Sequence, residues 1–412
     1  MSANERQRVT MRPIRETIPL EEARALILDA SQPLDRTERL ALADAGGRVI
    51  AKPVMSTLDV PPFDRAAMDG YAVRAEETFG AGRNDPKALR VVGTIHAGEM
   101  PREPVGPGEA MEIATGAPMP DGANAVVMVE ETERNGSGGV RIFTPVYPRQ
   151  NVGRRASDIG AGSVVVSSGD LLTPSRIGAL AAVGTVDVEV YAKPRIALIP
   201  TGNEVIQSSA RLEPGQIYDV NRFTLGALAA SHGCAPMPLP PALDTLDALS
   251  AAMDAALDAD VVVFSGGSSV GERDLMIDLL GARGEILFHG IAVKPGKPTL
   301  FGRVNGTPVF GMPGNPTSCL SNGYLLLVPM IRKMARLPEH RPHLVRVPLA
   351  RRIVSTTGRH QFYTVRLAEG TAVPAFKGSG DITSMAHADG YIEIPAQTDI
   401  VEAGELVDVK LF

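Results

Sequence analysis

The stretch VVVFSGGSSVGERD, from Val261 to Asp274, joins an apolar run to a loop rich in glycine and serine. The run Val261 to Phe264 has no polar residue and is bounded by turn residues, which is typical of a strand buried on both faces. In open α/β sheets, ligands bind beyond the carboxyl ends of the strands. The stretch therefore predicts a buried strand and, directly after it, a candidate binding loop.

The surrounding sequence alternates strand and helix patterns from about residue 193. A continuous apolar strand at Arg195 to Ile199 is followed by a helix from Asn221 to His232, closed by Gly233. Further helices are expected around Leu246 to Leu257, from Asp274 to Leu280, and from Asn315–Pro316 to about Leu337. Asn305–Gly306 between two apolar runs predicts a type I′ hairpin. Such alternation predicts a parallel sheet with helices on both faces.

The remaining sequence predicts helices near the N-terminus and two β-rich regions. Thr17 to Ser31 and about 35–45 read as helices, and Thr173–Pro174 starts another that ends near Gly184, before a strand from Val186 to Tyr191. Short strands separated by Gly, Pro, Asp and Asn predict a small all-β domain from about 50 to 150. The short runs Leu344 to Leu349, Gln361 to Leu367, Ala372 to Phe376 and Leu406 to Phe412 predict a terminal β domain.

Composition excludes several classes of protein. The 412 residues have a net charge of −6, no tryptophan and 4% aromatic residues, so the global basic or aromatic surface usual in nucleic-acid binding is missing. The two cysteines, Cys234 and Cys319, make neither a disulfide framework nor a CxxC zinc site. No apolar run reaches the ~18 residues needed to span a bilayer, and the polar start lacks an apolar signal core. We therefore expect a cytoplasmic protein that binds neither nucleic acid nor membrane.

Three loops follow strands of the predicted sheet and are candidates for chemistry. They are Thr201-Gly202-Asn203-Glu204, the Gly/Ser loop from Ser265 to Asp274, and Pro313-Gly314-Asn315-Pro316. Backbone N–H groups of the Gly/Ser loop could converge on an anion. Glu272 stands where a P-loop requires lysine, so that interpretation fails. Glu272 and Asp274 instead suit a hard cation that itself binds phosphate, although a simple tight turn remains an alternative.

Basic and acidic residues also recur in turns outside these loops. Lys294 and Lys297 lie three apart in a turn stiffened by two prolines, which suits an oxyanion, although a solvated basic turn is the simpler interpretation. Asp69 precedes a glycine, and Thr115 precedes Gly116, so each predicts a turn by default. The run Arg154 to Asp158 is typical of a solvated charged face. None of these segments identifies a site by itself.

The order of these segments along the chain resembles the molybdopterin molybdenumtransferase family, MoeA in bacteria and the gephyrin E domain in animals. The most specific segments are Met68-Asp69-Gly70-Tyr71-Ala72 and Lys294-Pro295-Gly296-Lys297-Pro298. The resemblance spans roughly residues 15 to 412. It implies an extended domain of 15–48 with 157–190, a β domain of 49–156, a MogA-like α/β domain of 191–338 and a C-terminal β-barrel of 339–412.

The resemblance also implies the reaction and the partners. Family members are homodimers whose cleft joins the α/β domain of one subunit to the β domain of the other. Adenylylated molybdopterin loses AMP, and molybdate supplies molybdenum to the dithiolene, with Mg²⁺ as the usual cation. The MogA-type adenylyltransferase and apo-molybdoenzymes are the implied protein partners.

The resemblance carries roles over to individual residues. The implied catalytic residues are Asp69, Thr115, Asp158, Glu204, Asp244 and Asp274. The implied substrate-binding residues are Ser265, Gly266, Gly267, Ser268, Ser269, Lys294, Lys297, Pro313, Gly314, Asn315, Arg359 and Ser379. The candidate metal ligands are Glu204, Glu272 and Asp274. Asn203, where the family often has aspartate, and Gly290, where many members carry a basic residue, depart from the pattern.

Two other functions remain open from the sequence. A MogA-type adenylyltransferase uses the same α/β domain, but that family is a single short domain. A non-enzymatic scaffold of the gephyrin E type would not need the acids and lysines retained here.

Overall fold

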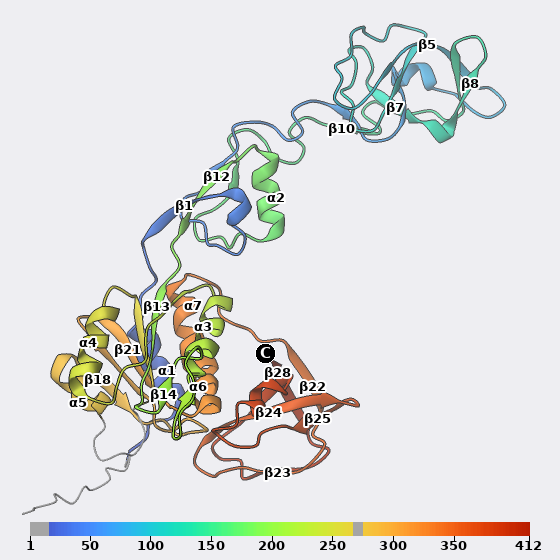
Figure 1. Ribbon diagram of the computed structural model, residues 1–412. Coiled ribbons are helices and arrows are strands. Elements are labelled where there is room, and N and C mark those ends of the chain that lie inside the picture. Colours follow the sequence, from blue (N-terminus) through green and yellow to red (C-terminus); the bar gives the residue numbers. More distant parts are fainter. Residues whose placement is uncertain (1–15, 267–274) are drawn as a thin grey trace, which may run out of the picture. The chain divides into compact units, whose positions relative to one another are not determined.

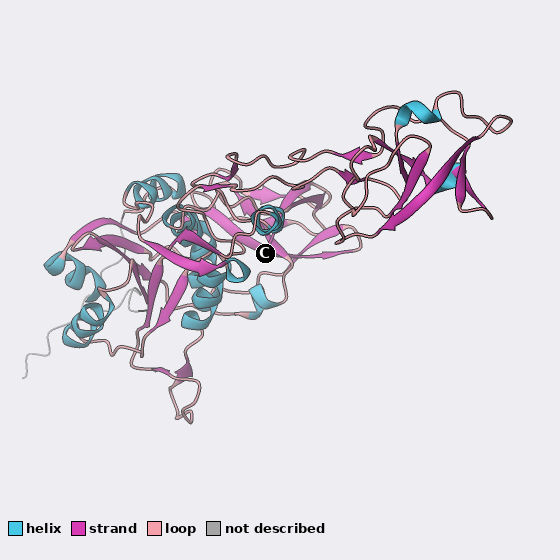
Figure 2. Cartoon of the chain, turned by 90° about the horizontal axis from the view of Figure 1, so that it is seen from above, coloured by secondary structure: helices cyan, strands magenta, loops and turns pink. Residues whose placement is uncertain are grey.

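The computed structural model describes residues 16–266 and 275–412 (Figure 1). The chain divides into two compact units, which are described separately. The larger unit consists of Met1–Glu38 and Tyr191–Phe412, and the smaller unit consists of Arg39–Val190. Helices gather in the larger unit, whereas the smaller one is mostly strands and loops (Figure 2).

A six-stranded sheet forms the centre of the larger unit. In spatial order its strands are β16 (Ala235–Pro238), β13 (Arg195–Pro200), β17 (Val261–Ser265), β21 (Thr307–Met312), β20 (Leu300–Val304) and β18 (Glu285–His289). The first four are parallel, and the last two are antiparallel to their neighbours. The predicted parallel sheet is therefore wrong at one edge. The predicted hairpin explains the difference, because Asn305 and Gly306 both adopt positive φ, 52° and 84°, and reverse the chain between β20 and β21.

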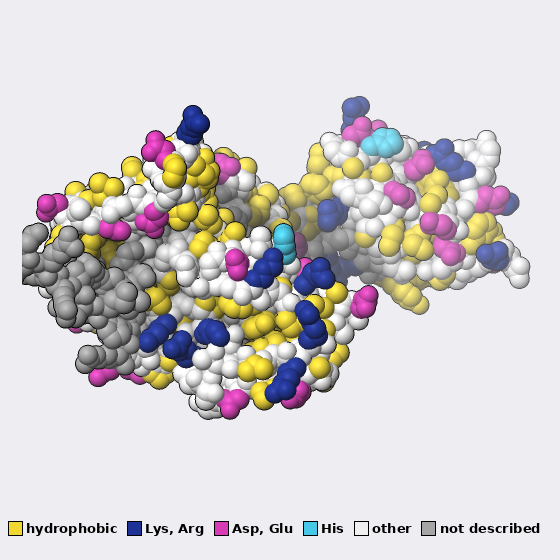
Figure 3. Space-filling view, turned by 60° about the horizontal axis from the view of Figure 1, so that its bottom comes forward, with side chains coloured by type: hydrophobic (Ala, Val, Ile, Leu, Met, Phe, Trp, Pro, Cys, Tyr) yellow, Lys and Arg dark blue, Asp and Glu magenta, His cyan; other side chains and the backbone are white. Residues whose placement is uncertain are grey.

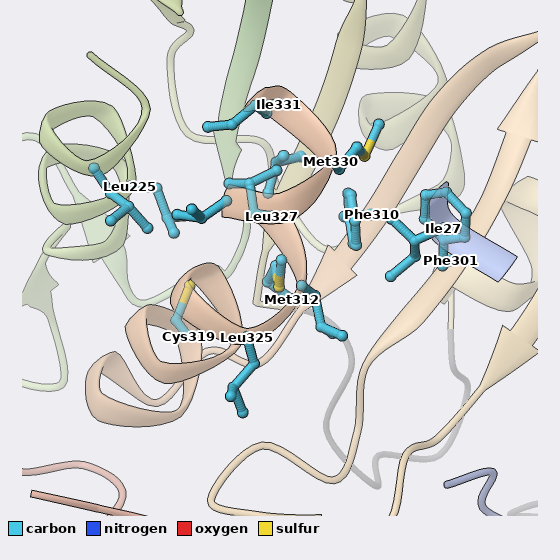
Figure 4. Close-up of a cluster of buried hydrophobic side chains, with 14 of the residues drawn as sticks. Ile27, Leu225, Phe301, Phe310, Met312, Cys319, Leu325, Leu327, Met330 and Ile331 are labelled. Carbon is cyan, nitrogen blue, oxygen red and sulfur yellow. The ribbon is translucent and has the colours of Figure 1, made fainter. Parts of the chain in front are cut away.

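Helices cover both faces of this sheet, as its alternating pattern predicts. One face packs against α1 (Leu20–Asp29), α3 (Asn221–Ser231), α6 (Pro316–Asn322), a π-helical segment (Gly323–Leu327) and α7 (Val328–Met334). The other packs against α4 (Leu246–Ala256) and α5 (Leu275–Arg283). Successive residues of β17 alternate between the two cores: Val263 joins the first and Phe264 the second. Figure 4 shows the first core around Phe310 and Leu327.

The C-terminal part of the larger unit is a second β structure. Its elements are β22 (Leu344–Pro348), β23 (Ile353–Val354), β24 (His360–Ala368), β25 (Thr371–Pro374), α8 (Thr383–Ala386), β26 (Gly390–Ile394), β27 (Ile400–Val401) and β28 (Leu406–Leu411). Strand pairs run from β25 through β24, β26 and β28 to β22. A bridge between Leu349 and Ala372 joins the end of β22 to β25, so the pairing closes into a ring.

Three short strands of the α/β region pair outside the central sheet. Strand β19 (Val293–Lys294) adds to the C-terminal sheet in parallel with β24, with Lys294 opposite Gln361. Strands β14 (Val205–Ile206) and β15 (Ile217–Tyr218) pair in parallel and form a ribbon after β13. We call residues 205–218 the ribbon below.

A six-stranded sheet also forms the core of the smaller unit, in the order β7-β4-β6-β5-β9-β8. Its strands are β4 (Gly70–Val73), β5 (Lys87–Ile95), β6 (Glu109–Ile113), β7 (Ala125–Met128), β8 (Thr132–Asn135) and β9 (Gly139–Ile142). Around it lie β3 (Arg65–Ala66), β10 (Val152–Gly153) and two 3₁₀ turns, Ala75–Thr78 and Val129–Glu131. A separate core around Leu172 and Leu180 contains β2 (Val54–Met55), β11 (Val164–Val166) and the 3₁₀ turn Leu42–Asp44. Helix α2 (Pro174–Ala182) starts after Thr173, whose side chain accepts from the Arg176 N–H as predicted.

The predicted helix at about 35–45 is wrong. Thr37–Ala41 forms strand β1, which pairs with β12 (Asp187–Tyr191), and only Leu42–Asp44 makes a 3₁₀ turn. The local sequence contains good helix formers, but a partner strand satisfies the backbone of this segment instead, and tertiary pairing overrides local propensity. Across the described residues, no helix combines the length and apolar character that a membrane crossing requires.

Candidate active site

A cavity of about 1210 Å³ lies in the larger unit, where the loops after β13, β17 and β21 meet the C-terminal β structure. It lies at the carboxyl ends of the parallel strands, as expected for an open α/β sheet. The predicted site residues that line it are Glu204, Asp244, Ser265, Gly266, Lys294, Lys297, Pro313, Gly314, Asn315, Arg359 and Ser379. The fold therefore gathers residues spread over 176 positions of sequence, from 204 to 379, around one volume.

Two neighbouring residues of the cavity lining, Glu204 and Asp244, are acidic, and we call them the acidic end. The loops that carry them are joined by a bridge between Thr201 and Ala242, and the Asp244 N–H donates to Oδ1 of Asn203 at 3.2 Å. Burial raises the pKa of Asp244, and the neighbouring Glu204 carboxylate raises it further. Oδ1 of Asp244 is buried without a hydrogen-bond partner among the described residues. This end therefore offers acceptor oxygens to a cation or a donor group.

Two buried polar residues outside the predicted site set, Thr201 of the first candidate loop and Asn221, line the same cavity. Thr201 and Asn221 are 2% and 7% exposed, and Oγ1 of Thr201 and Oδ1 of Asn221 have no partner among the described residues. The amide of Asn221 donates from Nδ2 to the Gly314 carbonyl at 2.8 Å, which fixes its orientation. Asn221 is the first residue of α3, so the predicted start of that helix was the available signal.

Lys294, Lys297 and Arg359 make another part of the cavity lining basic, and we call this part the basic end. Nζ of Lys294 donates to Oγ1 of Thr356 at 2.7 Å, and the pairing of Lys294 with Gln361 places Arg359 two residues before the partner of this lysine. Asn322 holds the turn that leads to Lys297, because its Nδ2 donates to the Gly296 carbonyl at 2.9 Å. Asn322 is fully buried, and Gly296 has φ 105°, where a side chain would be strained and would collide with the Asn322 amide. The turn is therefore held by tertiary contacts as well as by its prolines.

Ser379 is oriented by a neighbouring loop. Nδ2 of Asn315 donates to Oγ of Ser379 at 3.0 Å, so the serine hydroxyl can still donate its proton to another acceptor. Lys377, two residues earlier, also lines the cavity, and its ammonium donates to Oγ1 of Thr383 at 3.2 Å. The sequence analysis missed Lys377, although its position just before Gly378-Ser379-Gly380 was a usable signal. The surface in Figure 3 shows Lys and Arg side chains gathered on one face of the larger unit.

The smaller unit contains the other predicted catalytic residues. Oδ1 of Asp69 accepts from the Thr115 N–H at 2.7 Å, so two turns that are distant in sequence meet. This backbone hydrogen bond, with a second one from the Thr115 side chain, lowers the pKa of Asp69. Asp158 is exposed in the same unit, and its N–H donates to the Val60 carbonyl at 3.0 Å. The predicted catalytic set thus falls into two groups, one in each unit.

Five predicted residues, Gly267, Ser268, Ser269, Glu272 and Asp274, lie outside the described residues. Within 16–266 and 275–412, no cluster of three or more His, Cys, Asp or Glu side chains could hold a metal ion. Among the predicted acidic residues of the described chain, Glu204 and Asp244 are those that line the cavity.

Comparison with known proteins matches three family models along the chain. The MoeA N-terminal region (domain I and II) covers residues 18–184, a probable molybdopterin binding domain covers 197–333, and the MoeA C-terminal region (domain IV) covers 346–412. Molybdopterin molybdenumtransferase 2 of Mycobacterium tuberculosis is 36% identical over 382 residues, with 89% of this chain and 93% of that protein covered. This chain belongs to the molybdopterin molybdenumtransferase family. The resemblance drawn from the motifs is confirmed.

Other relatives in the molybdopterin molybdenumtransferase family agree along nearly the whole chain. The Haemophilus influenzae molybdopterin molybdenumtransferase is 32% identical and covers 96% of this chain and 98% of its own length. The crystal structure of a molybdopterin biosynthesis MoeA protein from Pyrococcus horikoshii superposes with a TM-score of 0.82 and 40% identity, covering 96% of this chain and 99% of that one.

The two departures from the MoeA pattern have visible structural roles. Asn203 accepts the Asp244 N–H through its side-chain oxygen, a role that an aspartate oxygen could also fill. Gly290 has φ 97°, and its N–H donates to the Thr299 carbonyl at 2.8 Å. A basic side chain at position 290 would therefore need an unfavourable backbone conformation in this chain.

Proposed function

We propose that this chain inserts molybdenum from molybdate into adenylylated molybdopterin and releases AMP, as a step of molybdenum cofactor biosynthesis. The observation that carries the proposal is a single cavity with an acidic and a basic end, in a chain whose relatives are named molybdopterin molybdenumtransferases. The reaction brings together two anions, molybdate and a phosphoanhydride. A cavity with both charges can bind an oxyanion at one end and a cation-bound phosphate at the other.

The basic end is the proposed molybdate site. Molybdate is a tetrahedral dianion, and it needs several directed donors to replace its hydration. Lys294, Lys297 and Arg359 supply charge, and the Ser379 hydroxyl, whose oxygen accepts from Asn315, can donate its proton to the oxyanion. Charge-assisted hydrogen bonds are the strongest that side chains make to oxyanions. Lys377 adds a further positive charge at the rim.

The acidic end fits the Mg²⁺ that the family pattern implies. Its fit rests on Oδ1 of Asp244, a buried acceptor without a partner among the described residues, next to the Glu204 carboxylate. Hard divalent cations prefer such oxygens, and Mg²⁺ is commonly bound by one or two carboxylates together with substrate phosphates. We propose Glu204 and Asp244 as ligands, with Glu272 and Asp274 as further candidates. When bound, such an ion polarises the phosphoryl group and neutralises its charge.

The smaller unit supplies the second group of acids. Asp69 is held ionised by the two hydrogen bonds from Thr115, so its carboxylate can accept a proton or orient a water. We propose that the chain is a homodimer in which Asp69, Thr115 and Asp158 of the partner subunit complete the cleft. The separation of the two catalytic groups into different units of one chain supports this arrangement.

The alternatives agree less well with the chain. A MogA-type adenylyltransferase would require only the region matched by the molybdopterin binding model, whereas this chain matches models on both sides of it. A scaffold would not need Asp244 to be half-buried with an unpaired oxygen. The adenylyltransferase and the apo-molybdoenzymes are instead proposed as the partners that supply the substrate and receive the product.

Release of AMP from adenylylated molybdopterin, with and without molybdate, tests the proposal. We expect AMP release that requires Mg²⁺ and a product that contains molybdenum only when molybdate is present. Binding of adenylylated molybdopterin without any AMP release would instead favour the scaffold.

A further inference from the structure

The wall of the cavity next to the acidic end is apolar, which phosphate and molybdate chemistry does not explain. Val205, Ile217 and Tyr218 of the ribbon line it. Ile217 is 55% exposed and Tyr218 is 38% exposed, although both are large apolar or aromatic side chains. Exposed apolar surface inside a cavity is typical of a ligand-binding wall.

The tyrosine of this wall is held in place. Its hydroxyl donates to the Ala210 carbonyl at 3.0 Å, so the polar tip is already bound within the ribbon. The exposed part of the side chain is therefore mainly ring. A flat aromatic ligand can stack on such a ring at little entropic cost, because the hydrogen bond has already restricted the side chain.

The ribbon is attached directly to the acidic end of the cavity. Val205 follows Glu204 in sequence, and the Ile217 N–H donates to the Glu204 carbonyl at 2.9 Å. The basic residues Lys294 and Arg359 are carried by β19 and the segment before β24, which belong to the C-terminal sheet pairing. The apolar wall is therefore carried by the same loop as Glu204, whereas the basic residues of the cavity are carried by other elements.

We propose that this wall, formed by Val205, Ile217 and Tyr218, is the site of the adenine ring of the adenylylated substrate. The inference rests on the proposed function and deepens it. In that substrate the dithiolene, the phosphoanhydride and the adenosine follow one another along the molecule. With molybdate at the basic end and the phosphates at Glu204 and Asp244, the adenosine extends beyond the acidic end, where the ribbon offers an aromatic face.

Adenine suits this wall better than the pterin. An aminopyrimidinone ring carries several polar edges that need partners when they are buried, whereas adenine binds well by stacking alone. Val205 and Ile217 are apolar, and the one hydroxyl among the three wall residues donates to the Ala210 carbonyl. The carboxylate of Asp219, which follows Tyr218 and also lines the cavity, is already paired with Arg222. The pterin is the competing occupant, and the test below separates the two.

A fluorescent reporter gives the most direct test, because the chain has no tryptophan. Tyr218→Trp would place a lone indole on the proposed wall. With Mg²⁺ present, we expect AMP to quench its emission, and we expect ribose 5-phosphate and non-adenylylated molybdopterin to leave it unchanged. AMP binding measured by dialysis without any change in emission would overturn the proposal, and so would quenching by molybdopterin.

Affinity measurements on a matched set complete the test. Tyr218→Ala is expected to weaken AMP binding about 5-fold or more, while Tyr218→Phe, which keeps the ring, stays near wild type. Phe223→Ala is the control, because Phe223 is 54% exposed on α3 and is not among the residues that line the cavity. Molybdate affinity should not change in any of the three.

The same variants separate this inference from the proposed function. Wild-type AMP release with unchanged AMP affinity in Tyr218→Ala would overturn the adenine site and leave the function standing. Absence of AMP release in the wild type would instead overturn the function. A loss of affinity for molybdopterin, with AMP affinity retained, would assign the wall to the pterin and overturn the adenine site.

Discussion

Asp69 in the smaller unit and Asp244 in the larger unit are both predicted catalytic aspartates, but their surroundings are opposite. Asp69 is exposed and accepts hydrogen bonds from Thr115, which lower its pKa. Asp244 is half-buried beside Glu204, and these surroundings raise its pKa and leave one oxygen unpaired. A carboxylate that is already satisfied suits a role as an acceptor for a proton or water, whereas an unsatisfied buried one suits binding of a cation.

The difference also concerns stability. Hydrogen bonds that favour the ionised form of Asp69 contribute to folding, whereas the raised pKa of Asp244 means that its charge opposes folding. A cost of this kind is typical of residues arranged for function. The two aspartates should therefore respond in opposite ways when their charge is removed.

The largest effect is expected at the acidic end. Asp244→Asn keeps the shape of the side chain and removes one of the proposed anionic ligands, so we expect Mg²⁺-dependent AMP release to fall at least about 100-fold, since even outer-shell partners of a metal contribute 10–100-fold. Steady-state AMP release over a range of Mg²⁺ concentrations measures it. As a control, the free energy of unfolding at pH 7 should be no lower for Asp244→Asn than for the wild type. Wild-type turnover in this variant would contradict the assignment of Asp244.

The proposed cleft between two subunits predicts complementation between two inactive chains. Asp69→Asn alone should lower AMP release about 100-fold, as loss of a general acid–base group does. When the Asp69→Asn and Asp244→Asn chains are mixed in equal amounts and reassociated at random, half of the dimers contain one chain of each kind. Each such dimer has one intact cleft out of two, so the mixture should regain about a quarter of wild-type activity.

The complementation assay needs a mixture formed without reassociation as its control. Activity in the mixture that stays at the level of the separate variants would exclude a cleft built from Asp69 of one subunit and Asp244 of the other. Sedimentation that showed a fully active monomer would exclude it as well.

A smaller effect is expected at the basic end. Lys297→Met keeps most of the side-chain length and removes the charge, so the apparent affinity for molybdate should fall at least about 10-fold, equivalent to ~1.4 kcal/mol. Molybdate titration of product formation measures it, and hydrolysis of the adenylate should change less. Lys52→Met, which removes a lysine paired with Glu189 in the smaller unit, is the matched control. If product formation by Lys297→Met depended on molybdate concentration as in the wild type, Lys297 would have no role in binding molybdate.

The smallest effects concern stability against pH. The lowered pKa of Asp69 gives a contribution that is present above the ordinary carboxyl value of 3.8 and is lost as the pH falls through the lowered value. Asp69→Asn should therefore lower the Tm slightly at pH 7, by no more than about 2 °C, and the difference should vanish in acid.

The pH dependence of stability that Asp244 contributes has the opposite sign to that of Asp69. Its raised pKa means that the wild-type fold gains stability as the pH falls through that value, so Asp244→Asn should be at least as stable at pH 7 and relatively weaker at pH 4. Scanning calorimetry of both variants at the two pH values checks this contrast. Equal pH dependence in both would remove the distinction between the two aspartates.

The sequence by itself determined the family and most local structure. Thr173–Pro174 starts α2, Asn305–Gly306 turns the hairpin, and the apolar run at Val261 forms the central strand, because capping, turn and burial preferences act within a few residues. The segments Lys294 to Pro298 and Met68 to Ala72 were recognisable from their consecutive residues alone. Their spacing along the chain identified the family without any knowledge of their contacts.

Only the tertiary structure decided which residues meet and in what state. The segment at Thr37–Ala41 became a strand because β12, far along the chain, pairs with it. The unpaired oxygen of Asp244, the Asn322 amide beneath Gly296 and the exposed ring of Tyr218 depend on contacts between positions far apart in the chain. Such contacts set burial and hydrogen bonding, and these in turn set charge state and binding, which no local pattern records.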